Sequence, residues 1–184
     1  GKIAGQGGEE KPSCCGPSCC GPDVDYTVFS ENYENKEGYN PDADLNLGCG
    51  IPTDYAGINK GNHVLDLGSG AGNDCFVARA IVGESGKVTG LDMTEHMIKK
   101  ARENCNKLNF KNVEFVLGDI EAMTFDDKIF DVVISITAIH HFDDIEKGLK
   151  EIKRVCKGKV ALSFLKKSRK RDEIIKLIRK YFKI

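Results

Sequence analysis

Short apolar runs recur along the chain from residue 63 onward, and each run is bounded by turn-forming or charged residues. Runs of this length that are rich in Val, Leu, Ile and Phe are typical of strands buried on both faces of a sheet. The pattern therefore predicts five strands, over His63–Leu67, Lys87–Leu91, Val113–Leu117, Phe130–Ile136 and Val160–Leu165.

Between these runs, apolar residues recur at intervals of three and four, which is the spacing of a helix with one buried face. Thr94 is placed to act as the N-cap of the second such helix. The predicted helices cover Asn73–Val82, Thr94–Leu108, Ile145–Val155 and Asp172–Phe182. Strands that alternate with helices favour right-handed crossovers and a doubly wound, mostly parallel α/β sheet of the Rossmann-like kind. Its ligand site is expected beyond the carboxyl ends of the strands.

The first 60 residues differ from the rest in composition, since all five prolines lie at or before Pro52. We therefore divide the chain into a Cys-, Gly- and Pro-rich segment over 1–60 and an α/β domain over 61–184. One short helix is expected in the first segment, around Val24–Tyr33.

The composition is that of a globular protein, with 40% hydrophobic and 30% charged residues among 184. No apolar stretch approaches the roughly 20 residues of a membrane helix, so we expect no membrane partner. The net charge is −1, but Lys166–Lys183 holds nine Lys or Arg against Asp172 and Glu173. This basic end indicates a solvated helix face or, less often, a surface for nucleic acid or another acidic partner.

Eight cysteines are present, and four of them lie close together as Cys14, Cys15, Cys19 and Cys20. The chain shows no export signal, and the spacing does not suit a disulfide framework or the usual zinc site with two residues between paired cysteines. We expect a reducing, cytoplasmic setting in which clustered thiols bind a soft ion. A flexible tail without a ligand is the plain alternative.

The strongest motif is Asp66-Leu67-Gly68-Ser69-Gly70-Ala71-Gly72, which follows the first predicted strand. A dinucleotide fingerprint would need glycine at position 73, where this chain has Asn. The pattern Asp-x-Gly-x-Gly-x-Gly is the one expected for S-adenosylmethionine (SAM). The glycines and Ser69 would let the backbone approach this ligand, and Asp66 would place negative charge near its cationic end.

Two further carboxylates follow the next strands. Asp92 ends the second strand and can accept both ribose hydroxyls of a nucleoside. Asp119 follows the third strand and can accept from the adenine amino group, while Ile120 packs on the ring. Each alone is more often a strand-end or turn residue, but together, after a glycine loop, they favour a SAM site.

These motifs resemble the class I SAM-dependent methyltransferases, and residues 14–135 resemble the arsenite methyltransferases more narrowly. The matching residues are the cysteine cluster 14–20, Gly48-Cys49-Gly50, the glycine loop with Asn73-Asp74-Cys75-Phe76, and Asp92-Met93-Thr94. The resemblance implies that Met93 and Thr94 help to hold adenosine. It also implies that Cys49, Cys14, Cys15, Cys19 and Cys20 are catalytic thiols that bind arsenic.

The reaction implied is transfer of the SAM methyl group to thiol-bound trivalent arsenic. The arsenic lone pair can attack the methyl group directly, so no general base is needed. A thiol reductant is expected in the cycle. Thr137 stands where the family has a Cys after the fourth strand, and the family's further C-terminal Cys has no counterpart. Five strands also make a shorter sheet than the family's seven, so an exposed sheet edge is expected.

Two other functions fit parts of the chain. An RNA methyltransferase would use the basic helix for phosphates and His140 or His141 as a base or substrate contact. A metalloid-binding protein without turnover would use only the cysteines. Label from SAM distinguishes these, because it enters arsenicals, RNA or neither.

Overall fold

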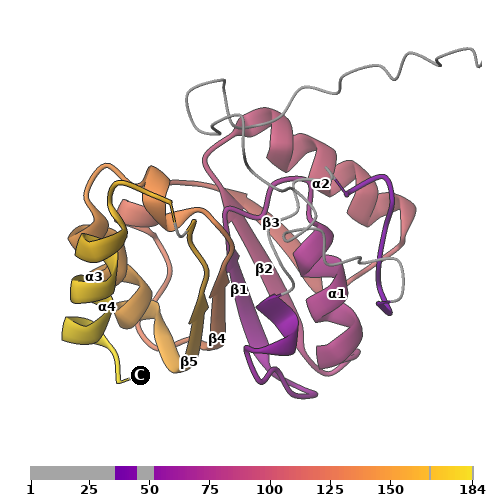
Figure 1. Ribbon diagram of the computed structural model, residues 1–184. Helices are drawn as coiled ribbons and strands as arrows, with labels where there is room; N and C mark the ends of the chain where they lie inside the picture. The colour runs from indigo at the N-terminus through magenta and orange to yellow at the C-terminus, as the bar shows by residue number, and fades with distance from the viewer. Residues whose placement is uncertain (1–35, 45–51, 166, 184) are drawn as a thin grey trace, which may run out of the picture.

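A computed structural model describes residues 36–44, 52–165 and 167–183. Strands and helices alternate along it as predicted (Figure 1). The strands are β1 (His63–Leu67), β2 (Lys87–Asp92), β3 (Val113–Leu117), β4 (Phe130–Ser135) and β5 (Cys156–Leu162). The α-helices are α1 (Asn73–Val82), α2 (Glu95–Lys107), α3 (Ile145–Val155) and α4 (Arg171–Tyr181). Single 3-10 turns are η3 (Pro52–Asp54), η4 (Ile120–Ala122) and η5 (Ile139–His141).

The five strands form one sheet in the order β3-β2-β1-β4-β5, and every pair is parallel. The chain moves outward from β1 to β3, and then returns to the other side of β1 to form β4 and β5. This reversal places the topological switch point between β1 and β4, where α/β sheets bind their ligands. The prediction of a doubly wound parallel α/β fold is confirmed.

Helices cover both faces of the sheet, with α1 and α2 on one side and α3 and α4 on the other (Figure 1). Successive residues of β1 point to opposite faces, so that Val64 joins the core under α1 and α2 while Leu65 joins the core under α3 and α4. Ala43, Ala56 and Ile58 also pack into the first of these cores.

Several local predictions were wrong, among them the ends of β2, α2 and α4, which each differ by one residue. The last strand begins at Cys156 and ends at Leu162, because α3 runs into β5 without a connecting residue and Cys156 already pairs with Phe130. The fourth strand ends at Ser135 rather than Ile136. Thr94 is the N-cap residue of α2, but its side chain makes no capping hydrogen bond.

Among the described strands β5 pairs only with β4, so β5 and β3 are the two edges of this sheet. No helix in the described part of the chain is long and apolar enough to cross a membrane. The expected helix over Val24–Tyr33 lies outside the described residues.

Candidate functional site

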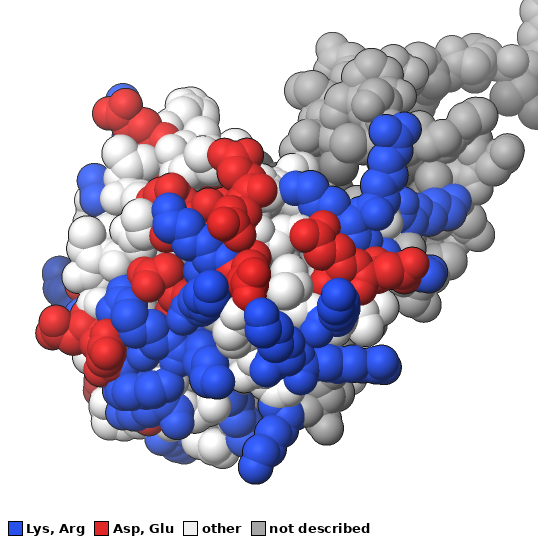
Figure 2. Space-filling view, turned by 90° about the vertical axis from the view of Figure 1, so that its left-hand side faces the viewer, with Lys and Arg blue, Asp and Glu red and all other residues white. Residues whose placement is uncertain are grey.

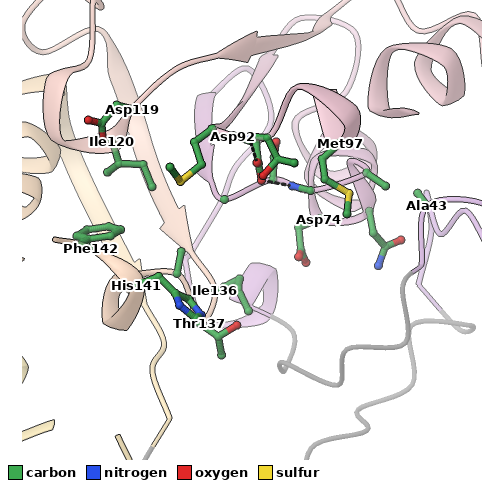
Figure 3. A pocket seen from close by; sticks show the side chains of 18 of the residues that line it. Ala43, Asp74, Asp92, Met97, Asp119, Ile120, Ile136, Thr137, His141 and Phe142 are labelled. Atoms are coloured by element: carbon green, nitrogen blue, oxygen red, sulfur yellow. Dashed lines mark hydrogen bonds between the residues drawn. The ribbon is translucent and has the colours of Figure 1, made fainter. Parts of the chain in front are cut away.

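A cavity of about 450 Å³ lies beyond the carboxyl ends of β1 to β4, at the switch point. Segments that are far apart in sequence meet there. Most of the predicted cofactor residues line it, namely Gly68, Ser69, Gly70, Asp92, Met93, Thr94, Asp119 and Ile120. Figure 3 shows Asp119, Ile120 and Phe142 on one side of this cavity and Asp74, Met97 and Ala43 on the other, with Asp92 between.

The glycine loop after β1 needs its glycines for conformation. Gly68 and Gly70 have φ angles of 78° and 52°, in the left-handed region that side chains disfavour. A Cβ atom at Gly68 would also lie 2.9 Å from the Cβ of Ala138, which lines the same cavity. The Gly68 N–H donates to the Leu91 carbonyl oxygen, which fixes the loop against the end of β2.

Asp92 joins two sides of the cavity. Its Oδ2 accepts from the Gly70 N–H at 3.0 Å, and its Oδ1 accepts from the Thr94 N–H at 2.7 Å (Figure 3). The carboxylate therefore holds the glycine loop to the start of α2. Each carboxylate oxygen can accept a further hydrogen bond, so Asp92 can also accept from the hydroxyl groups of a ligand.

Asp119 and Ile120 lie side by side at the end of β3. The Asp119 Oδ1 accepts from the Glu121 N–H at 2.8 Å, so the side chain also begins the η4 turn. Met93 lines the same cavity although 80% of its surface is exposed. A flat apolar ring between Ile120 and Met93 would be shielded from water, as adenine requires.

Asp66 is not among the residues that line the cavity, and its predicted role as a negative charge near the cofactor stays a prediction. It is 2% exposed, and its Oδ2 accepts from the Cys75 Sγ at 3.2 Å. Burial raises the pKa of Asp66 well above its ordinary range, and the charges of Asp74 and Asp92 raise it further. The residue ties β1 to the first turn of α1, which is a positioning role.

Gly72 is also absent from the cavity lining. Its φ is 97°, and a Cβ there would lie 2.7 Å from the Phe115 ring and 3.0 Å from the Phe76 ring. Glycine at this position is explained by the turn into α1 and the aromatic packing below it. The predicted contact of Gly72 with the cofactor stays a prediction.

Two buried polar atoms of the cavity lining lack hydrogen-bond partners within the described structure. They are Ser69 Oγ and Asn73 Oδ1, at the glycine loop and the start of α1. Both atoms are shielded from solvent, so they lie beneath the cavity surface. The acceptors that the cavity offers to the hydroxyl and amino groups of SAM are the carboxylates of Asp92 and Asp119.

Several lining residues were missed as site residues from sequence. Asp74 and Met97 come from the first turns of α1 and α2, Glu121 comes from η4, and Asp44 and Asp143 come from loops. The signal for Asp74 was its place directly after the glycine loop. Met97 also fits the buried face of an amphipathic helix, so its spacing in the sequence did not distinguish a site residue from a core residue.

Thr137 and His141 also line the cavity, from the segment after β4. Thr137 has a φ of 50°, which is strained for a β-branched residue. Its N–H donates to the Ser163 carbonyl oxygen and lies 3.1 Å from Ser163 Oγ. The neighbouring His140 packs against His141 and is not among the lining residues, and burial lowers its pKa.

All five predicted thiol ligands lie outside the described residues, namely Cys14, Cys15, Cys19, Cys20 and Cys49. The cysteines of the described part, Cys75, Cys105 and Cys156, are buried and unpaired with one another. Burial raises the pKa of the Cys75 thiol, so it is not a reactive thiolate. No group of three or more metal-binding side chains was found among the described residues.

A family model described as "Methyltransferase domain" matches residues 58–183. This chain belongs to the methyltransferase domain family. The expected membership of the class I SAM-dependent group is thereby confirmed. The matched range of this methyltransferase domain begins just before β1 and includes every strand of the sheet.

Relatives of this methyltransferase domain differ in their named substrates. An arsenite methyltransferase of Halobacterium salinarum is 40% identical over 164 residues, covering 82% of this chain and 42% of the relative. A ubiquinone/menaquinone biosynthesis C-methyltransferase UbiE of Cronobacter sakazakii is 36% identical over 105 residues, covering 56% of this chain and 42% of the relative.

A solved structure gives the same result for the fold. The arsenic(III) S-adenosylmethionine methyltransferase of Chlamydomonas reinhardtii superposes with a TM-score of 0.58 at 32% identity, covering 68% of this chain and 52% of that one. The methyltransferase domain described here spans less than half the length of the curated relatives it matches.

Proposed function

We propose that this chain binds SAM and transfers its methyl group to thiol-bound trivalent arsenic. The observation that carries the first part is the cavity at the switch point. Its lining holds six carboxylates together with apolar side chains such as Ile120. SAM is a nucleoside with two cationic groups, and these are the features that such a lining would recognise.

Different residues of the cavity would bind different chemical groups of SAM. Asp92 and Asp119 would accept from the ribose and adenine groups, and Ile120 would pack on the ring. Met93 and Thr94 would flank adenosine at the start of α2. The loop Gly68–Gly70 would approach the amino-acid end, where Asp74 supplies negative charge. When bound, SAM supplies a methyl group on a positively charged sulfur.

The acceptor is proposed from the relatives and from the cysteines. Asp44 lines the cavity and precedes Cys49 by five residues, a chain length of at most roughly 18 Å. We propose that Cys49 presents arsenic to the cavity, that Cys14, Cys15, Cys19 and Cys20 deliver it, and that a thiol reductant renews the cycle. The reducing cytoplasm would keep these thiols free.

This function also gives the two parts of the chain separate tasks. The segment 1–60 would handle arsenic, and residues 61–184 would hold SAM. The two tasks can be separated experimentally, because substitutions in the cysteine cluster leave the cavity residues unchanged.

One structural observation weighs against RNA as the acceptor. The cavity lining contains carboxylates and one imidazole, and no Lys or Arg among the described residues. A phosphodiester backbone would be repelled there. C-methylation of a small aromatic molecule is the second candidate, because the UbiE relative shares more than half of this chain.

The test follows the label from methyl-labelled SAM. The protein is incubated with arsenite and a thiol, with bulk tRNA, or with a phenolic quinone precursor. Label in soluble or volatile arsenicals supports the proposal, whereas label in RNA or in the phenol contradicts it. Binding of adenosylhomocysteine (SAH) without transfer to any acceptor would indicate a metalloid-binding protein instead.

A second experiment tests the division of tasks. Replacing Cys14, Cys15, Cys19 and Cys20 by Ser should weaken arsenite binding and leave SAH binding unchanged. The Ser18→Ala variant, within the same cluster, is the matched control. If the four-cysteine variant also lost affinity for SAH, the proposed separation would be wrong.

A further inference from the structure

The segment between β4 and α3 forms one wall of the cavity, which we call the β4–α3 wall. Its lining residues are Ile136, Thr137, Ala138, His141, Phe142 and Asp143. At one end, the Cβ of Ala138 would lie 2.9 Å from a Cβ placed on Gly68, so the wall borders the glycine loop. At the other end, Figure 3 shows Phe142 on the same side of the cavity as Ile120. The position of this wall therefore bears on both ends of the proposed SAM site.

The β4–α3 wall is not part of a long regular element. At its start, Thr137 has a φ of 50°, and its N–H donates to the Ser163 carbonyl oxygen at 3.2 Å. A β-branched residue keeps such a backbone conformation only where the surrounding structure holds it. Farther along, the wall contains the three-residue turn η5, and short turns of this kind have weaker hydrogen-bond geometry than an α-helix. The wall therefore depends on contacts from other elements.

Lys170 supplies such a contact at the far end of the wall. Its Nζ donates to the Phe142 carbonyl oxygen at 2.7 Å. A hydrogen bond from a charged donor is stronger than one between neutral groups. Lys170 is not among the residues that line the cavity, so its effect on the cavity passes through Phe142.

Phe142 is packed closely enough to transmit this contact. It is 6% exposed, and it belongs to the same core cluster as Ile174 of α4. A Cβ placed on Gly148 of α3 would lie 2.5 Å from the Phe142 ring, so the ring fits against the helix without spare room. A shift of the Phe142 backbone would therefore displace a ring that lines the cavity.

The helix α4 gives Lys170 a fixed base. Lys170 is the N-cap residue of α4, and its side chain makes no capping hydrogen bond. A positive charge at this end of a helix opposes the helix dipole, so the contact with Phe142, and not the helix, explains Lys at this position. Ile174 is fully buried, and near the other end of α4 the Lys180 Nζ lies 2.6 Å from the Glu146 Oε1 of α3.

We propose that Lys170 is a positioning residue for SAM: through the Phe142 carbonyl, it holds the β4–α3 wall in the place that the bound cofactor needs. The inference rests on the SAM-binding part of the proposed function and does not depend on the methyl acceptor. Lys170 itself contacts neither SAM nor the acceptor.

The experiment measures SAH binding to the full chain by calorimetry. Lys170→Met removes the donor and keeps the apolar stem, and Lys170→Gln carries a donor that is one atom too short. We expect both to raise the SAH dissociation constant by roughly three- to tenfold, as for the partial loss of a charged hydrogen bond. Lys170→Arg keeps a charged donor and should stay within about twofold of the natural protein. Lys167→Met, at an exposed position of the same basic segment, is the matched control and should bind SAH normally.

Two further measurements separate positioning from a general loss of stability. Burial lowers the pKa of His140, and the charges of His141 and Lys170 lower it further. NMR titration should therefore show a raised His140 pKa in Lys170→Met and Lys170→Gln, and an unchanged one in Lys170→Arg. In transfer from labelled SAM to thiol-bound arsenite, the KM for SAM should rise with the SAH dissociation constant, whereas kcat should change by less than about twofold. Urea unfolding shows that each variant is folded.

The outcomes separate this inference from the proposed function. Unchanged SAH affinity in a folded Lys170→Met or Lys170→Gln protein overturns the role of Lys170. An equal loss in Lys167→Met would assign the effect to net charge, and a Lys170→Arg protein as weak as Lys170→Met would show that the charged donor is not what matters. Each of these results also overturns the inference. The expected losses of SAH affinity, together with no transfer to arsenite by the natural protein, would overturn arsenite as the acceptor and leave the role of Lys170 supported.

Discussion

Asp92 shows how one side chain can organise a binding site before any ligand arrives. Both of its oxygens accept backbone N–H groups, from Gly70 and from Thr94. Its place at the end of β2 was predictable from the apolar run that it ends. Its double backbone contact was not predictable, because that contact depends on how the glycine loop turns toward α2.

The first prediction concerns this contact. Asp92→Ala removes the acceptor for both N–H groups and for ligand hydroxyls, so we expect SAH affinity to fall by about 1–3 kcal/mol. Asp92→Asn keeps one acceptor oxygen and should lose less. Calorimetry at neutral pH measures both variants, and circular dichroism shows whether they remain folded. Unchanged affinity in a folded Asp92→Ala protein would remove Asp92 from the site.

Asp66 carries the second prediction. Its pKa in the folded protein is raised, first by burial, so above about pH 4 the folded state keeps a proton that the unfolded chain loses. The folded state therefore becomes less stable as the pH rises from 3.8, the ordinary pKa of an aspartate, toward the raised pKa of Asp66. Asp66→Asn removes this titration, and its advantage over the natural protein should grow with pH.

Urea unfolding between about pH 5 and pH 8 measures this effect. Asn keeps an oxygen that can accept from the Cys75 thiol, so the packing is preserved. Asp126→Asn, at an exposed position, should follow the pH dependence of the natural protein. Parallel curves for Asp66→Asn and the natural protein would show that Asp66 is ionised in the fold.

At the scale of elements, the sequence predicted the strands and helices that a local pattern of apolar residues marks. Four strands were located to within one residue, and α1 and α3 have the predicted bounds. The start of β5 was missed because Lys157, Gly158 and Lys159 are exposed and show no apolar run. Gly158 sits where a Cβ would lie 2.2 Å from the Asp131 carbonyl oxygen, at the irregular register between β4 and β5. Only the pairing with β4 makes this segment a strand.

The third prediction tests how α3 packs beside the cavity. Gly148 lies on α3, and a Cβ there would lie 2.5 Å from the Phe142 ring, which is 6% exposed and lines the cavity. Gly148→Ala should cost about 1–3 kcal/mol by overpacking and should weaken SAH binding by displacing Phe142.

The exposed neighbour Lys147 supplies the control, because Lys147→Ala should change stability by no more than about 0.5 kcal/mol. Urea unfolding and calorimetry report the two effects separately. A Gly148→Ala protein with undiminished stability would mean that the Phe142 ring moves freely.

At the scale of the whole molecule, charge is divided between regions. The cavity lining is acidic, and the face of α3 and α4 gathers Lys and Arg (Figure 2). The sequence showed the basic end of the chain but not the acidic cavity. The six acids are spread from Asp44 to Asp143, and only the fold brings them together.

The fourth prediction follows from this division. SAM carries one more positive charge than SAH, so its affinity should depend more steeply on salt. Between about 20 and 500 mM salt, SAM affinity should fall several-fold more than SAH affinity. Calorimetric titrations of both ligands measure the difference. Equal losses would show that the cavity acids are neutralised in the folded protein.

The direct passage from α3 into β5 leaves no slack between the two elements. Val160 faces the core under α3 and α4, whereas Ala161 faces the core under α1 and α2. One residue inserted after Val155 would exchange these faces, because neighbouring strand residues alternate. An inserted residue should therefore be tolerated less well at the α3–β5 junction than at the exposed turn around Asp126 and Asp127.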